Sequence, residues 1–192
     1  MPVGQGPARL GQLDAVEAGF ASVGDLISQH RQKAALGEAM RLVGEANKYV
    51  ADTQPFKLKG EDPATQARLA TVLHTLAQAV TDLNLMLSPF LPHAANDVDR
   101  VLGGSGRIAP MPRIEEVAEL DPEHLPEAFD GRTGYPIITG DYQDAPTWER
   151  HPVTVGTPVA KPTPVFTKLD ESIIEAELAR YAGSVPDDVT GA

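Results

Sequence analysis

Residues 47–58 have the sequence NKYVADTQPFKL, and they contain the strongest local signal in the chain. An amphipathic helical pattern runs into this stretch, and Pro55 must end it, because the residue before a proline is pushed out of the α region. Phe56 follows this stop and lies outside the apolar stripe. Spacing alone leaves two interpretations open. Phe56 either packs against the next helix or offers its ring to a nucleic-acid base, where stacking contributes roughly 1–3 kcal/mol.

Helical periodicity extends on both sides of this stretch. Apolar residues recur there at three- and four-residue spacing, the pattern of a helix with one buried face. Asp62 and Pro63 are a typical N-cap and first helical residue, and Gly103-Gly104 is a typical helix end. Four helices are predicted, at 9–29, 34–52, 63–88 and 92–102. Because the connections are short, we expect neighbouring helices to be antiparallel and to form a bundle.

The remainder of the chain has a different character. Ten of the 17 prolines lie beyond residue 110, and 121–164 shows little periodicity. We interpret 113–120 as a helical turn and 165–167 as a short strand, with Asp170 capping a last helix. The predicted fold is mainly α, an antiparallel helix bundle with a Pro-rich irregular C-terminal arm and a final helix. The expected parts are a disordered start (1–8), the bundle (9–104), an extended acidic arm (105–170), a helix (171–183) and a disordered tail (184–192).

Composition limits the functional classes. The 192 residues can bury one core, or one core with an appended segment. The chain has no cysteine, so disulfides and Cys-ligated zinc are excluded. Neither a membrane-spanning apolar run nor a secretory signal is visible, so we expect a cytoplasmic protein without a membrane partner.

Charge divides the chain in two. Residues 1–110 carry ten basic and eleven acidic side chains, a net charge of −1. Residues 111–192 carry the other 6 basic and 16 acidic side chains, a net charge of −10. The first part can therefore approach a phosphate backbone, whereas the second part is repelled by one.

No catalytic or metal-binding motif is apparent. His93 and Asp97 are four residues apart on a predicted helix, but no third ligand stands at a recognisable spacing, so a surface pair is favoured. Residues 103–106, GGSG, follow a helix and not a strand, so a helix stop explains them better than a phosphate-binding loop. Tyr49 and Phe90 are interpreted as helix-packing residues. We therefore predict no catalytic residue, no metal site and no cofactor in this chain.

Three segments together resemble the C-terminal anticodon-binding domain of bacterial methionyl-tRNA synthetase, a class I aminoacyl-tRNA synthetase. The first, 46–58, is similar to the family's helix that ends in Asn-x-Tyr and is followed by Pro-Trp. The second, LSPFLP at 87–92 with 94–95 and 102–103, is similar to its Pro-x-Leu-Pro segment. The third, 156–158 with 162–170, is similar to its return strand ending in Phe-x-x-Ile-Asp. The segments occur in the family's order and span about 10–180.

The chain departs from the family pattern at two places. The family usually has Trp where this chain has Phe56, and a phenyl ring stacks over a smaller area. The family's first anticodon helix, with an Asn and an Arg four residues apart, has no counterpart near the start of this chain. The catalytic domain, with its HIGH-like and KMSKS-like motifs and its zinc knuckle, has no counterpart either.

The resemblance implies a tRNA anticodon-binding module of a synthetase whose reaction is the ATP-dependent ligation of methionine to tRNA(Met). Pro55 and Phe56 would then meet the anticodon loop, with Lys48, Lys57 and Lys59 near phosphates. The implied partners are this loop and a catalytic domain in cis or in trans, and the acidic arm would fold back over the bundle. We also expect an isolated chain of this kind to self-associate. The alternative is a free-standing helical protein-interaction module that no longer binds RNA.

Overall fold

The computed structural model describes residues 7–118, 134–140 and 146–182, with side chains described from Asp14 onward. The expectations for residues 1–6 and 184–192 lie outside this part. The chain divides into two compact units, Met1–Lys161 and Pro162–Ala192. None of the described helices is long and apolar enough to cross a membrane.

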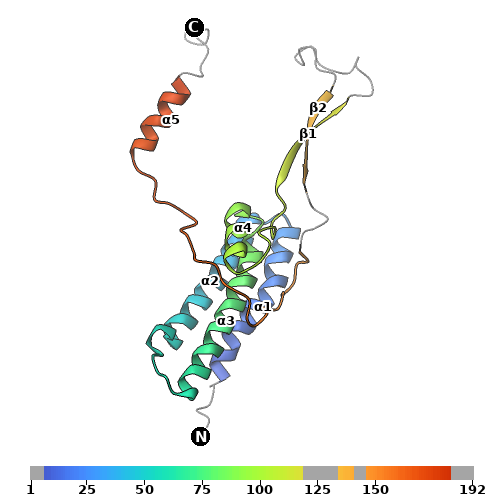
Figure 1. The fold of residues 1–192 in the computed structure, drawn as a ribbon. Helices are drawn as coiled ribbons and strands as arrows, with labels where there is room; N and C mark the ends of the chain where they lie inside the picture. Colours follow the sequence, from blue (N-terminus) through green and yellow to red (C-terminus); the bar gives the residue numbers. More distant parts are fainter. Residues whose placement is uncertain (1–6, 119–133, 141–145, 183–192) are drawn as a thin grey trace. The chain divides into compact units, whose positions relative to one another are not determined.

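The first unit is built on a helix bundle (Figure 1). Its helices are α1 (Pro7–Ser28), α2 (Gln32–Thr53), α3 (Pro63–Leu87) and α4 (Pro92–Val101). Helices α1, α2 and α3 contact one another, and α4 contacts α3. All four lie close to their predicted positions, so the prediction of a mainly α bundle is confirmed.

The core lies between the first three helices. Each contributes three buried residues to one cluster, which are Val16, Phe20, Val23, Ala35, Ala39, Leu42, Leu83, Leu85 and Met86. Phe90 packs against this cluster and Tyr49 is buried, as predicted for both. Burial of such aliphatic side chains, at about 25 cal/mol per Å² of apolar surface, is the main force that holds amphipathic helices together.

Asp62 begins α3 as predicted. Its Oδ1 accepts a hydrogen bond from the backbone N–H of Thr65 at 2.9 Å. This bond lowers the pKa of the Asp62 carboxyl below its ordinary value of 3.8, because it favours the charged form. Pro63 at the first helical position needs no N–H partner, so the cap and the proline together fix where α3 starts.

The predicted helix stop after α4 is also present. Gly103 and Gly106 have φ of +89° and +73°, a conformation that glycine adopts without strain. The Asp99 carboxylate accepts the N–H of Gly106 at 2.8 Å. Asn96 is buried in α4, and its side-chain amide binds both backbone polar groups of Ala109. It accepts a hydrogen bond from the N–H at 2.8 Å and donates one to the C=O at 3.1 Å. The segment after α4 is therefore fixed against the bundle.

The prediction for residues 113–120 is wrong. Residues 113–120 were expected to form a helical turn, but β1 (Pro112–Ala118) pairs antiparallel with β2 (Gly134–Gly140). The register places Ile114 opposite Ile138. Partners this far apart along the chain leave no local pattern, and the three-residue spacing of Ile114 and Val117 imitates a helix. β2 lies within the segment 121–164, which was expected to be extended and largely irregular.

The second unit contains α5 (Ser172–Ala182), close to the predicted final helix. Asp170 accepts the backbone N–H of Ser172 at 3.0 Å, which lowers the pKa of its carboxyl and confirms its role as a cap. The short strand expected at 165–167 is wrong, because this segment is a bend without a ladder partner. The prolines that precede it, at 162 and 164, have no N–H to donate to a ladder and therefore disfavour pairing next to this segment.

Candidate functional site

The site begins where α2 ends. Gln54 takes a left-handed conformation, with φ 45° and ψ 58°, and its N–H still reaches the carbonyl of Val50 at 2.9 Å. Pro55 then starts a single 3₁₀ turn, η1 (Pro55–Lys57), closed by the N–H of Leu58 on the carbonyl of Pro55 at 3.1 Å. Left-handed backbone is uncommon outside glycine, so the chain turns sharply at a position that the proline enforces.

Phe56 lies in this turn with 62% of its surface exposed. The alternative that Phe56 packs against the third helix is therefore not what the structure shows, although η1 as a whole contacts α3. Tyr49, one helical turn before the stop, is buried instead, and Thr53 Oγ1 donates to its carbonyl at 2.7 Å. The buried Tyr49 and the hydrogen-bonded Thr53 fix the end of α2, and the solvent-exposed ring of Phe56 comes directly after this end.

The three predicted lysines surround this turn. Lys48 lies on α2, Lys57 in η1 and Lys59 in the connection to α3, and all three are exposed. No ion pair of these lysines occurs among the residues that the structure describes. The acidic residues of the same stretch balance them, however, namely Asp52, Glu61 and Asp62. This surface therefore offers an exposed aromatic ring without an excess of positive charge.

The remaining sequence candidates behave as surface or structural residues. His93 is exposed, and its expected partner Asp97 forms an ion pair with Arg100. No group of three or more potential metal ligands occurs in the described ranges.

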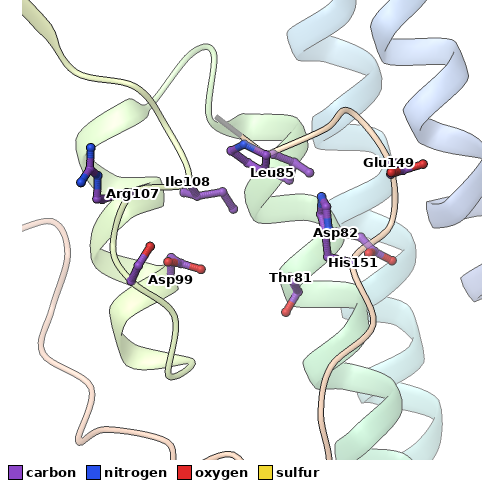
Figure 2. A pocket seen from close by; sticks show the side chains of 10 residues that line it. Thr81, Asp82, Leu85, Asp99, Arg107, Ile108, Glu149 and His151 are labelled. Atoms are coloured by element: carbon purple, nitrogen blue, oxygen red, sulfur yellow. The ribbon is translucent and has the colours of Figure 1, made fainter. Parts of the chain in front are cut away.

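A pocket of about 240 Å³ lies elsewhere, between α3, the segment after α4 and residues 146–151 (Figure 2). Asp82 and His151 line it from one side, and Asp99, Arg107 and Ile108 from the other. Several of its polar groups already have partners within the chain. Asp82 binds Arg150, Asp99 accepts the N–H of Gly106, and the His151 Nε2 lies 3.1 Å from the carbonyl of Thr147. We therefore regard this pocket as a space left between packed segments, and not as a ligand-binding site.

The network of Arg150 beside this pocket was not predicted from the sequence. The Arg150 guanidinium binds Asp82 of α3 at 2.8 Å, and the Asp82 side chain is fully buried. The two residues are 68 positions apart, so no spacing rule connects them. The available signal was Asp82 itself, an acidic residue between the apolar positions Val80 and Leu83 of a helical stripe.

The chain is homologous to one region of the aminoacyl-tRNA synthetases. More narrowly, the relatives are methionine–tRNA ligases, and the chain is homologous to part of them. The resemblance seen in the sequence is therefore confirmed.

Three bacterial methionine–tRNA ligases illustrate this similarity. The chain is 62% identical to the one from a Nocardioides species over 168 residues, which are 88% of this chain and 26% of that protein. It is 53% identical to the one from Beutenbergia cavernae over 171 residues, again 88% and 26%. It is 48% identical to the one from Salinispora arenicola over 182 residues, 95% and 28%. The chain thus spans about a quarter of the length of these relatives. No family model matches it.

Solved structures agree at the level of the fold. Mycobacterium tuberculosis methionyl-tRNA synthetase bound by methionyl-adenylate superposes with a TM-score of 0.57 and 23% identity, covering 87% of this chain and 26% of that one. Its apo form gives the same TM-score over 88% and 27%.

Proposed function

We propose that this chain is a tRNA-binding module of a methionine–tRNA ligase, with the anticodon loop of tRNA(Met) as its ligand. The observation that carries the proposal is the exposed ring of Phe56, placed directly after the helix stop at Pro55, in a chain homologous to a region of these ligases. A base stacked on this ring would gain the interaction that aromatic platforms supply in RNA recognition.

Within this proposal, Lys48, Lys57 and Lys59 supply phosphate contacts, because they are exposed and close to Phe56 in the chain. The reaction of the whole ligase is the ATP-dependent joining of methionine to its tRNA, and a catalytic domain in cis or in trans would perform it. The module itself contributes no catalytic residue and needs no cofactor of its own. It would act in the cytoplasm, where tRNA is charged.

The test is the affinity for a transcript with a CAU anticodon. Phe56→Ala should weaken binding by roughly 5- to 150-fold, the equivalent of about 1–3 kcal/mol of stacking. Phe56→Trp should bind at least as tightly as the wild type, because indole offers a larger face. Phe166→Ala is the matched control, since Phe166 is also exposed, at 70%, but lies in the second unit. Equal affinity of wild type and Phe56→Ala would contradict the stacking role.

A second candidate function rests on charge. The net charge of −11 and the balanced charge around Phe56 favour a protein-interaction module that has lost RNA binding. Salt dependence separates the two functions. Phosphate contacts by the three lysines would make the affinity fall steeply with salt concentration, by about one logarithmic unit of slope per contact. Absence of any salt-dependent tRNA binding would favour the interaction module.

A further inference from the structure

Residues 146–160, here called the strap, cross the bundle and are held at a small number of points. The first is Trp148, whose Nε1 donates to the carbonyl of Phe20 at 2.7 Å while its ring meets the Phe20 ring edge-on at 5.8 Å. Gly24 of α1 makes room for it, because a Cβ there would lie 2.7 Å from the Trp148 Nε1. The strap therefore starts with a fitted aromatic contact on α1.

The second point is polar. Arg150 forms ion pairs with Glu17 of α1 and with the buried Asp82 of α3, so one strap residue bridges two helices. Gln78 of α3 adds two backbone contacts, accepting the N–H of Val153 at 2.9 Å and donating to the carbonyl of His151 at 3.0 Å. It also donates to the Asp82 Oδ1 at 2.9 Å, which joins all these groups into one network.

The third point lies at the end of α4. The N–H of Ala160 donates to the carbonyl of Val101 at 2.9 Å. Thr157 and Pro158 pass so close to Gly103 that a Cβ there would lie 2.5 Å from the Thr157 Cγ2 and 2.9 Å from the Pro158 oxygen. The chain leaves the first unit directly after this contact, because Lys161 is the last residue of that unit.

Apart from these points the strap is loosely attached. None of its residues is fully buried, and Val155 and Val159 are exposed to 84% and 66%. A segment with few buried apolar contacts opens at a lower free energy than the core beneath it. The strap can therefore detach while the bundle stays folded.

We propose that the strap attaches reversibly to the bundle and thereby limits the distance that the tether to the second unit can span. Arg150 and Gln78 are the positioning residues that hold the strap. When it is attached, the tether to α5 starts at Ala160, and twelve residue steps lead to Ser172, about 40 Å at full extension. When it detaches, the strap joins the tether from Pro146 onward, and twenty-six steps to Ser172 allow about 90 Å.

Trp148 is the only tryptophan of the chain, so its fluorescence reports the strap directly. In a urea titration of the full chain, the Trp148 emission should shift to the red, and its quenching by acrylamide should increase, before the helical circular dichroism signal falls. Coincident fluorescence and helix transitions would overturn the proposal, because they would make the strap an inseparable part of the bundle.

Two variants test which side chains hold the strap on the bundle. Arg150→Gln should move the Trp148 transition to lower urea. While the strap is still attached, however, this variant leaves the buried Asp82 without a cation and could destabilise α3. Gln78→Ala removes two strap contacts without leaving a charge unpaired, and it should produce the same early release with the helix signal intact. Arg41→Gln is the matched control, because it removes two exposed ion pairs, with Glu38 and Glu45, both within α2. A Gln78→Ala protein whose Trp148 transition is unchanged would contradict the assignment.

Reach can be measured separately. The chain has no cysteine, so His93→Cys in α4 and Ser172→Cys in α5, both exposed, give two unique labelling positions. Fluorescence energy transfer between the labels should fall in Gln78→Ala at urea concentrations that keep the helices folded. Unchanged transfer after release of Trp148 would show that the strap does not control the tether.

Discussion

At the scale of single residues, Gly19 of α1 lies where side chains of α2 and α3 both approach the helix backbone. A Cβ at this position would overlap Leu42 Cδ1 and would lie 3.1 Å from Met86 Sδ. Leu42 and Met86 are both fully buried, so neither side chain has free space into which to turn. Glycine is therefore required at Gly19 by packing, although glycine within a helix is unfavourable by itself.

Gly19→Ala should destabilise the bundle, whereas Gly37→Ala should stabilise it. For Gly19→Ala we expect a loss of about 1–3 kcal/mol in the free energy of unfolding, as for other overpacked cores. For Gly37→Ala on α2, where a Cβ would meet nothing within 4 Å, we expect a gain of up to about 1 kcal/mol from helix propensity. Urea denaturation followed by circular dichroism measures both. A similar gain in the two variants would contradict the close approach.

Individual residues also show what a sequence can predict. The Asp62 cap and the stop at Pro55 depend on neighbours within four positions, and both are present. Exposure of Phe56 and burial of Tyr49 depend on which side of the helix end faces the core. The spacing of residues therefore could not decide whether Phe56 is exposed or packed against the next helix. The Asp82–Arg150 pair depends on the folded path of the strap, and no local rule could find it.

At the scale of elements, the helices were predictable because each has its own periodic stripe and end signals. The hairpin was not, because β1 and β2 are defined by pairing with each other across residues 119–133. Its composition did contain a signal, since the β-branched residues Ile137, Ile138 and Thr139 are typical of strands. The predicted return of the arm over the bundle is confirmed for the strap, through Trp148 and its neighbours.

Two glycines test the contact between α4 and the strap. Gly103 and Gly156 both have φ of +89°, but only Gly103 has the strap against it, whereas a Cβ at Gly156 would meet nothing within 4 Å. Gly156→Ala should therefore lose only the left-handed conformational term, about 1–2 kcal/mol. Gly103→Ala should lose more, because Pro158 must also move, and its Trp148 emission should shift to the red. Thermal unfolding of both variants gives the comparison, and equal losses would argue against the contact.

At the scale of the whole molecule, the first unit has a nearly neutral bundle and the acid is concentrated further along the chain. This distribution is consistent with the proposed function only if RNA meets the η1 end of the bundle, where Phe56 and the three lysines are exposed. Because like charges repel over about 10 Å at moderate ionic strength, the acidic half would discourage binding elsewhere on the chain.

Apolar surface leads to the last prediction, which concerns self-association. Leu36 and Met40 of α2 are exposed, and α5 carries Ile174 and Leu178 at helical spacing with more than half of each side chain exposed. Exposed apolar stripes of this kind mark contact surfaces. We therefore expect the chain to bind an apolar dye and to show a mass that increases with concentration in light scattering.

Substitutions locate the surface responsible. A double variant Ile174→Gln and Leu178→Gln should reduce association if α5 carries it, and Met40→Gln should do so if α2 does. Val155→Gln is the control, because Val155 is a single exposed apolar residue of the strap, and such residues are common on monomeric proteins. Hydrophobic association strengthens with salts that are excluded from protein surfaces, so sulfate should increase the mass measured by light scattering. If pairs of opposite charges held the copies together, salt would lower this mass. A protein that stays monomeric and does not bind the dye under both conditions would show that these stripes do not suffice for association.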